Sequence, residues 1–176
     1  MMKVFEDFTK ILEEILDMDV GTFIKAYRDT LPDYEIVHED TTIEELFEHM
    51  AQGRDYIIIV DSKGRLRGAI TYLDILMYIG RHEHRVLTTA LGSIRGTLTI
   101  SRIPSETLAK MKVSILMKRL PPHVSIDHSV REALNIMENC DTHYTVVQTK
   151  DGAVVGIITM HAIFRAAMEK LRRKSL

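Results

Sequence analysis

Two segments of this chain carry nearly the same sequence. Gly68–Asp74 (GAITYLD) recurs as Gly156–Ala162 (GIITMHA), with the second copy lying 88 positions later. The flanks match as well, because Thr42–Leu46 (TIEEL) corresponds to Ser129–Ala133 (SVREA) at an offset of 87, with one residue added near Asp141. A repeat of this kind restricts the architecture to two copies of one supersecondary unit of about 50 residues.

Each copy opens its first helix with the same capping signal. Thr42 with Glu45, and Ser129 with Glu132, form an S/T-x-x-E capping box. In this box the hydroxyl accepts a hydrogen bond from the backbone amide three residues later, and the carboxylate accepts one from the backbone amide of the capping residue. Apolar residues then recur at i, i+3, i+4 and i+7, which predicts an amphipathic helix in each copy. We expect these helices at 43–51 and 130–139.

Short β-branched runs predict the strands. Ile57–Val60 is apolar without alternation, which is typical of a strand buried on both faces, and Thr145–Val147 is its shorter counterpart. A turn containing glycine follows each run and favours a hairpin into a returning strand. Helical spacing resumes after Thr71 and Thr159, so each copy is an α+β unit. We expect the remaining strands at 35–38 and 66–70 in the first copy and at 123–126 and 154–158 in the second.

Segments outside the repeats have their own patterns. An amphipathic helix is expected at residues 3–17, and its acidic polar face argues against binding to an anionic membrane. We expect this helix to pack on the repeats or to build a homodimer contact. The expected divisions are an N-terminal helix at 1–19, a first domain at 20–81, a connector at 82–110, a second domain at 111–170 and a basic C-terminal tail at 171–176.

The last strand-to-helix junction carries the pattern G-h-h-T-x-x-D, which is complete in the first copy and ends in Ala162 in the second. This pattern and the element order resemble the CBS domain, named after cystathionine β-synthase. Val113–Arg119 also looks like the V-x-D-I-M-T lead-in that commonly opens such a domain. Two copies in one chain make a tandem, or Bateman, module. The resemblance implies two β-α-β-β-α units packed sheet to sheet about a pseudo-two-fold axis, with clefts that in many relatives hold AMP, ADP, ATP or S-adenosylmethionine.

The resemblance also implies ligand contacts. Thr71 would approach phosphate, and Asp74 would accept hydrogen bonds from the ribose hydroxyls, which suits an acceptor-only carboxylate. Adenine would lie against the backbone of the first two strands. In the second copy Thr159 is kept, but Ala162 takes the place of the Asp, so we expect that cleft to be altered or empty. The expected adenosyl contacts are Ile36, Val37, Tyr56, Ile57, Ile58, Gly68, Thr71, Asp74, Lys118, Arg119 and Thr159, with Lys118 and Arg119 facing phosphate.

Some of these residues have a simpler explanation. Thr71 and Asp74 also make an ordinary helix cap, because a carboxylate in the first turn is favoured by the helix macrodipole. The basic run Lys170–Lys174 likewise places cations at a helix end, where the macrodipole favours them. Gly68 and Gly156 are also places where another backbone or a ligand can approach closely.

The connector allows two sharper hypotheses. His82 and His84 would lie on one face of a strand and could bind a metal ion. Arg81 and Arg85, four residues apart on a continued helix, could instead face a phosphate. A charged, solvated connector is the default. Within it we expect a strand at 97–100 and a helix at 104–111.

The sequence lacks the motifs of common enzyme classes, with no G-x-S-x-G elbow, Walker A loop or H-E-x-x-H motif. We therefore expect neither catalysis nor a required cofactor or metal. A net charge of −2 gives no electrostatic footprint for nucleic acid. The single Cys140 allows no internal disulfide, and no apolar run approaches the about 20 residues that span a bilayer. These features fit a cytoplasmic protein.

The expected function is that of a stand-alone regulatory protein. It would bind AMP, ADP, ATP or S-adenosylmethionine in the cleft between the repeats and signal by conformational change to a protein partner that the sequence does not identify. We also expect a homodimer. One alternative is a ligand-free dimerising scaffold. Another is a nucleic-acid-associated protein that uses residues 80–112 and the basic C-terminal run.

Overall fold

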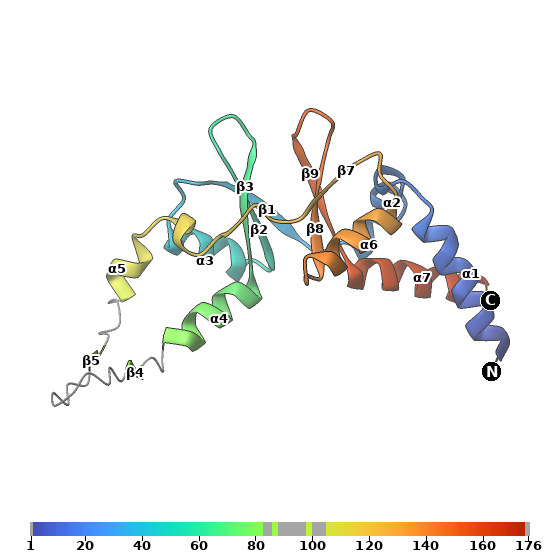
Figure 1. The fold of residues 1–176 in the computed structure, drawn as a ribbon, viewed down its shortest axis with the longest axis horizontal. Coiled ribbons are helices and arrows are strands. Elements are labelled where there is room, and N and C mark those ends of the chain that lie inside the picture. The colour runs from blue at the N-terminus through green and yellow to red at the C-terminus, as the bar shows by residue number, and fades with distance from the viewer. Residues whose placement is uncertain (1, 83–85, 88–97, 100–104, 175–176) are drawn as a thin grey trace.

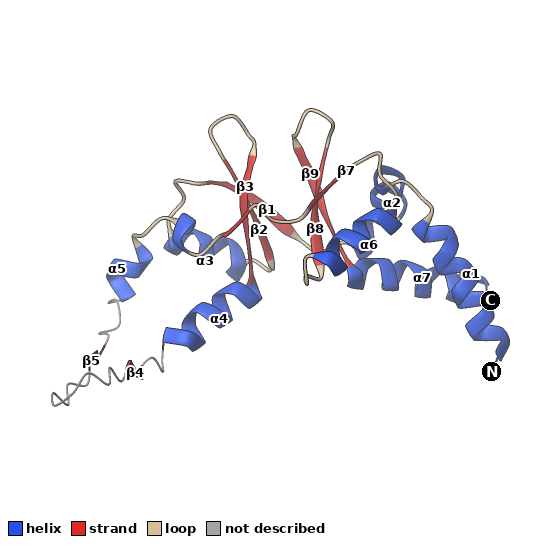
Figure 2. Cartoon of the chain, in the orientation of Figure 1, coloured by secondary structure: helices blue, strands red, loops and turns tan. Residues whose placement is uncertain are grey.

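The protein has two halves whose β-sheets face each other and whose helices lie on the outer sides (Figure 1, Figure 2). This computed structural model describes residues 2–82, 86–87, 98–99 and 105–174. The arrangement is the α+β fold predicted from the repeats, with two copies packed sheet to sheet about a pseudo-two-fold axis and an added N-terminal helix. No helix in the described ranges has the length and apolar content that crossing a bilayer requires.

The elements of the first repeat, in chain order, are β1 (Tyr34–His38), α3 (Ile43–Ala51), β2 (Tyr56–Val60), β3 (Leu66–Thr71) and α4 (Tyr72–His82). β1 runs parallel to β2, and β2 runs antiparallel to β3. Tyr34, Tyr56 and Thr71 are therefore register partners in one row at the end of the sheet from which α4 starts. The capping box of Thr42 and Glu45 is formed at the start of α3.

The second repeat has the same order of elements, namely β7 (His123–Ser125), α6 (Val130–Asn139), β8 (Tyr144–Gln148), β9 (Val154–Thr159) and α7 (Met160–Lys174). β7 runs parallel to β8, and β8 runs antiparallel to β9. Both hairpins have a register irregularity at the equivalent position, just before the turn. The predicted repeat of secondary structure is confirmed, with β8 longer than the expected 145–147.

The segment between the repeats contains short elements, which are β4 (Val86–Leu87), β5 (Leu98–Thr99), α5 (Ser105–Ala109), the 3-10 turn η2 (Val113–Ile115) and β6 (Lys118–Arg119). β4 pairs antiparallel with β5. The expected strand at 97–100 corresponds to β5, and the expected helix at 104–111 corresponds to the shorter α5. His84 and Arg85, on which the metal and phosphate hypotheses for the connector depend, lie outside the described residues.

The strands of each sheet contribute side chains to two hydrophobic cores, one on each face. In the first repeat, Ile57, Ile59 and Ile70 face the helices and pack with Leu46 of α3. The alternate residues face the other sheet, because neighbouring strand side chains point to opposite faces. This buried layer between the sheets contains Tyr56, Ile58, Ala69, Tyr144, Val146 and Ile157. The two repeats are therefore joined by a continuous apolar interface.

A short lead-in precedes each repeat and docks on the other repeat. Val113 of η2 donates its amide to the carbonyl of Thr41 in the first repeat at 2.9 Å. At the equivalent place, Val20 opens α2 (Val20–Ala26) and donates its amide to the carbonyl of His128 in the second repeat at 2.8 Å. The lead-ins thus cross between the halves and hold them together in addition to the apolar layer.

The N-terminal helix α1 (Met2–Leu16) packs against α7 of the second repeat. Its apolar stripe includes Ile11 and Ile15, which are buried in the core of that repeat. Ion pairs flank this contact, since Arg131 of α6 reaches Glu13 at 2.6 Å and Lys170 of α7 reaches Glu14 at 2.7 Å. Of the two arrangements expected for this helix, packing within the chain is the one observed.

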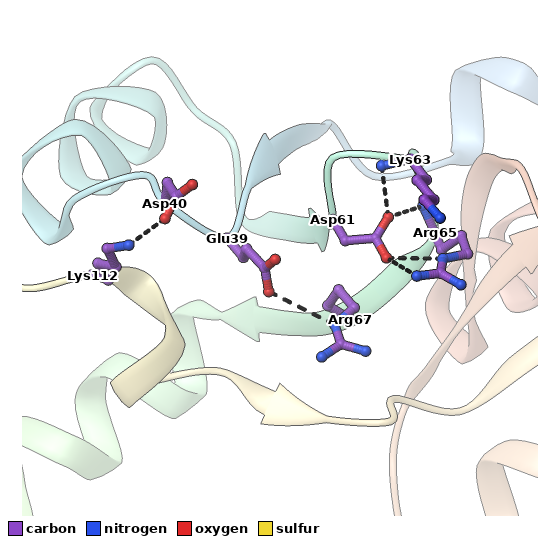
Figure 3. A network of polar contacts seen from close by, with 7 residues as sticks. All are labelled: Glu39, Asp40, Asp61, Lys63, Arg65, Arg67 and Lys112. Carbon is purple, nitrogen blue, oxygen red and sulfur yellow. Dashed lines mark hydrogen bonds and ion pairs between the residues drawn. The ribbon is translucent and has the colours of Figure 1, made fainter.

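A network of ion pairs surrounds the first hairpin (Figure 3). Asp61 accepts hydrogen bonds from the backbone amides of Lys63 and Arg65 at 2.9 and 3.0 Å, and from Arg65 Nε at 2.8 Å. The guanidinium of Arg65 and these amides lower the pKa of Asp61 to about 2. Lys112 also pairs with Asp40, which ties the second lead-in to the first repeat. These contacts keep the hairpin and the lead-in in place beside the junction of the repeats.

The two motif glycines have different neighbours, which leads to a testable difference. A Cβ atom at Gly68 would lie 2.6 Å from the Sδ atom of Met117, whereas one at Gly156 would lie 3.5 Å from Ile24 Cδ1. We expect Gly68→Ala to lower the free energy of unfolding by about 1–3 kcal/mol, because Met117 must shift. Gly156→Ala should be neutral or stabilising by up to about 1 kcal/mol, because Ala has less backbone entropy to lose in a strand. Urea unfolding of both variants tests this, and equal effects would contradict it.

Candidate functional site

The junction between β3 and α4 places Thr71 and Asp74 in direct contact. The Oδ2 atom of Asp74 accepts hydrogen bonds from the Thr71 amide and hydroxyl, both at 2.8 Å. The Asp74 amide donates in return to Thr71 Oγ1 at 3.3 Å. The pair therefore caps α4, as the simpler explanation of these residues predicted. Within the described part of the chain, the second oxygen of Asp74, Oδ1, accepts no hydrogen bond.

Residues of the second repeat lie near this junction. Burial and, to a smaller degree, the negative charge of Asp74 raise the pKa of the Tyr144 hydroxyl. The ring centroids of Tyr144 and Tyr56 lie 5.7 Å apart, and those of His143 and Tyr56 lie 6.0 Å apart. Tyr56 has its own pKa raised to about 12, chiefly by burial. An aromatic cluster of Tyr56 from the first repeat and His143 and Tyr144 from the second thus borders the Thr71–Asp74 cap.

Three buried polar atoms in this region have no hydrogen-bond partner among the described residues. They are His143 Nε2, Tyr144 Oη and Thr145 Oγ1. Buried polar groups are nearly always paired, so each such atom needs an explanation. Thr145 belongs to the opposite face of β8, because it alternates with Tyr144 along the strand. Only the His143 and Tyr144 atoms are therefore on the side of the aromatic cluster.

The other residues expected around adenine divide between the two faces of the first sheet. Tyr56 and Ile58 belong to the buried layer between the sheets. Val37 and Ile57 pack in the core beneath the helices, so their side chains point away from that layer. Ile36 is 40% exposed at the edge strand β1. Only Tyr56 and Ile58 of this set therefore place their side chains in the layer between the sheets, while the expected adenine contacts are with the strand backbone and stay a prediction.

Gly68, Lys118 and Arg119 meet at the opposite edge of the same sheet. β6 pairs with β3 so that Gly68 is opposite Arg119 and Ala69 is opposite Lys118. Both basic residues are exposed, and Met117 covers the side of Gly68 that a side chain would occupy. At this edge, the lead-in of the second repeat is the segment that closely approaches Gly68.

The equivalent junction of the second repeat lacks the carboxylate. Thr159 caps α7 by accepting a hydrogen bond from the Ala162 amide at 3.0 Å. Ala162 itself is fully buried. The second motif therefore serves here as a helix cap. The basic C-terminal residues Lys170 and Lys174 continue α7 and pair with Glu14 and Asp7 of α1.

Two cavities that are lined by described residues lie between the repeats. One of about 530 Å³ is lined by Tyr34 and Arg54 of the first repeat and Gly156 of the second. The other, of about 270 Å³, lies between Leu66 of the first hairpin and His123 of the second repeat. The resemblance implied clefts between the repeats, but the sequence did not indicate which residues line these two cavities, because the lining depends on how the halves are placed. Among the described residues, no group of three or more His, Cys, Asp or Glu side chains is arranged to hold a metal ion.

Comparison with protein families identifies both repeats. The family model of the CBS domain matches residues 26–81 and 112–169. The comparison with curated proteins gave no match.

Solved structures share the fold at low sequence identity. A CBS domain protein from Pyrobaculum aerophilum complexed with AMP has a TM-score of 0.60 at 16% identity, over 89% of this chain and 99% of its own. The CBS domain pair of protein MJ0100 in complex with 5′-methylthioadenosine and S-adenosyl-L-methionine has a TM-score of 0.58 at 20% identity, over 87% and 98%. The cytosolic domain of the Mg²⁺ channel MgtE in complex with ATP has a TM-score of 0.50 at 23% identity. This chain covers 45% of that longer domain, which in turn aligns with 76% of this chain.

Proposed function

The chain belongs to the CBS-domain family, and from that premise we propose that it is a regulatory module that binds an adenosyl ligand between its two repeats. Relatives of the same fold are described in complex with AMP and with 5′-methylthioadenosine and S-adenosyl-L-methionine. These complexes support an adenosyl compound as the ligand class. The proposed role is non-catalytic, and the ligand acts as a signal.

The observation that carries the proposal is the unpaired Tyr144 hydroxyl. It belongs to the second repeat, is buried, and lies within the field of the Asp74 carboxylate of the first. A ribose diol supplies donors for the free Oδ1 atom of Asp74, and a ligand acceptor or donor would pair with Tyr144 and His143. Thr71 stays in place as the cap that orients Asp74. The ligand would thus satisfy polar atoms that have no hydrogen-bond partner in the described part of the chain.

Signalling follows from a ligand that contacts both halves. Asp74 belongs to the first repeat and Tyr144 to the second, so the ligand senses how the sheets are placed relative to each other. It shifts the population only if it binds one arrangement more tightly than the other. We propose that the favoured arrangement changes the surface presented to a protein partner.

A dimerising scaffold is the second candidate, and one observation favours it. The exposed face of α4 carries Leu73, Leu76 and Met77, and Leu76 is 61% exposed. At the equivalent positions of α7, the second repeat has the polar residues His161 and Arg165 beside Phe164. Exposed apolar patches often mark interfaces, so we propose that a homodimer would use α4. A homodimer that persists in Leu76→Glu would contradict this placement.

Thermal unfolding with a ligand panel tests the proposed function. AMP, ADP, ATP, S-adenosylmethionine and NAD are each added to the wild-type protein, to Tyr144→Phe and to Thr145→Val. A ligand at about 100 times its dissociation constant stabilises the native state by about 2.7 kcal/mol. Both variants should be more stable than wild type without ligand, because each loses an unpaired buried hydroxyl that costs about 1–3 kcal/mol.

The two variants should differ once a ligand is present. Tyr144→Phe should bind the stabilising ligand about 2- to 10-fold more weakly, because a hydrogen bond worth about 0.5–1.5 kcal/mol is lost. Thr145→Val is the matched control and should bind as wild type does, because its side chain lies on the other face of β8. No thermal shift with any of the five ligands would refute the adenosyl proposal and favour the scaffold. Equal loss of affinity in both variants would refute the role of Tyr144.

A further inference from the structure

A groove lies between α3 and α5, on the outer side of the first repeat. It has a volume of about 500 Å³. Its apolar lining consists of Ile43, Phe47 and Ala51 of α3 with Leu108 and Ala109 of α5. The side chain of Phe47 is 44% exposed. Exposed apolar surface of concave shape is typical of an interaction site. We call this feature the α3–α5 groove.

The second repeat shows what covers the equivalent surface. Val130, which opens α6, donates its amide at 2.8 Å to the carbonyl of Met18, just after α1. Ile43, which opens α3, donates its amide at 2.9 Å to the carbonyl of Met111, just after α5. The end of α1 and α5 are therefore equivalent, but α1 has 15 residues and α5 has five. A long amphipathic helix thus covers the second repeat where the first repeat has a short one (Figure 1).

The helices that receive α1 and α5 differ in charge at equivalent positions. Arg131 of α6 pairs with Glu13 and Asp17 of α1 at 2.6 and 2.9 Å. Glu44 of α3 corresponds to Arg131, at the offset of 87 that relates the two capping boxes. Glu44 and Glu48 both line the α3–α5 groove, and neither makes an ion pair in the described part of the chain. The charge that attracts an acidic helix on the second repeat is thus reversed on the first.

Two further charges lie on the side of α5. Glu106 corresponds to Glu13, and Lys110 corresponds to Asp17, at the offset of 93 that relates the two methionines. Lys110 makes no ion pair with any described residue. The two carboxylates that line the groove, together with that of Glu106, outnumber this one cation. An acidic helix such as α1 is therefore disfavoured here, and a basic helix is favoured.

We propose that the α3–α5 groove is a docking surface for an amphipathic helix with a basic polar face, supplied by a protein partner. The apolar stripe of this helix packs on Phe47, and its cations pair with Glu44 and Glu48. On the second repeat, α1 makes the same kind of contact with the opposite charges. The inference goes beyond the proposed function, because docking needs no adenosyl ligand and uses no residue of the Thr71–Asp74 cap.

Two fluorescently labelled peptides are the probes. One has the sequence of residues 2–17 of this chain, and the other has the same sequence with Glu13→Lys, Glu14→Lys and Asp17→Lys. The two peptides share one apolar stripe and differ only in charge. Fluorescence anisotropy measures their binding to the full chain.

Four forms of the protein are compared. They are the wild type, Glu44→Lys/Glu48→Lys, Phe47→Ala and the control Glu6→Lys/Glu138→Lys. The control changes the net charge as much as the groove variant does, at exposed positions outside the groove. Unfolding midpoints confirm that all four forms are folded.

The lysine-substituted peptide should bind the wild-type protein, and the unaltered peptide should bind it about tenfold more weakly or not at all. Glu44→Lys/Glu48→Lys should reverse this preference, and Phe47→Ala should weaken binding of the lysine-substituted peptide by about tenfold. The control should bind as wild type does, and added salt should weaken binding. The proposal is overturned if the lysine-substituted peptide does not bind, or if charge reversal in the groove leaves its affinity unchanged.

Two results would assign the groove to a different occupant, and either would overturn the proposal. Tighter binding of the unaltered peptide to the wild-type protein would assign the groove to α1 of a second copy. Self-association of the wild type that Phe47→Ala abolishes, measured by analytical ultracentrifugation, would show that another surface of a second copy covers it.

Discussion

Replacing Ile15 by Ala should lower the free energy of unfolding by about 2–5 kcal/mol, the usual cost of truncating a large buried aliphatic side chain. Ile15 is fully buried between α1 and the second repeat. Its removal leaves a cavity in the same core that holds Phe23 of α2 and Met137 of α6. Urea unfolding followed by circular dichroism gives the change directly.

Phe5 is the matched control on the same helix, because its side chain is 71% exposed. Phe5→Ala should change the free energy of unfolding by no more than about 0.5 kcal/mol, as is usual for surface substitutions. If Ile15→Ala were as mild as Phe5→Ala, α1 would not belong to the core of the second repeat. A separate unfolding transition for α1 would contradict the same conclusion.

Replacing Asp74 by Ala should lower the affinity for the adenosyl ligand by at least about a hundredfold. Two hydrogen bonds from a ribose diol to an ionised carboxylate are lost, and a hydrogen bond to a charged group is worth about 1.5–3 kcal/mol. The same change removes the acceptor of the Thr71 amide and hydroxyl. It should therefore also lower the stability of the unliganded protein by about 0.5–2 kcal/mol, as the loss of a helix cap does. Calorimetric titration and urea unfolding measure the two effects separately.

Glu45→Ala separates the cap from the ligand contact. Glu45 closes the capping box of α3 with bonds of 2.8 and 3.0 Å to the Thr42 amide and hydroxyl, the same arrangement that Asp74 makes with Thr71. Glu45→Ala should lower the free energy of unfolding about as much as Asp74→Ala does, and it should leave ligand affinity unchanged. If Asp74→Ala lost only stability and kept full affinity, Thr71 and Asp74 would be an ordinary helix cap.

Much of the fold was predictable because its determinants are local. The capping boxes at Thr42 and Ser129 and the β-branched run Ile57–Val60 specify helix starts and a buried strand within a few residues. Because the sequence repeats, each of these patterns occurs in both copies. The reading of Thr71 with Asp74 as a cap also needed only i to i+3 spacing, and the structure has that cap.

Other features depend on contacts between distant segments, and a single sequence does not indicate them. Lead-ins such as that of Val113 dock on the other repeat, although proximity along the chain suggested that each belongs with the repeat that follows it. The approach of Tyr144 to Asp74 depends on how the two sheets meet. The cavity of about 530 Å³ likewise depends on the connection before β1, which places Lys25 and Arg28 beside Gly156. The sequence does show that the first lead-in lies farther from its first strand than the second lead-in does, since Val20 precedes Val37 by 17 positions and Val113 precedes Val124 by 11. Only the assembled halves show that this longer connection lines a cavity.

We propose that an adenosyl ligand bridges Asp74 of the first repeat and Tyr144 of the second. A crystal structure of the protein with the ligand that gives the largest thermal shift tests it most directly. We expect ribose hydroxyls within hydrogen-bond distance of Asp74 and a polar ligand atom paired with the Tyr144 hydroxyl. A ligand seated elsewhere, with the Tyr144 hydroxyl still unpaired, would contradict it.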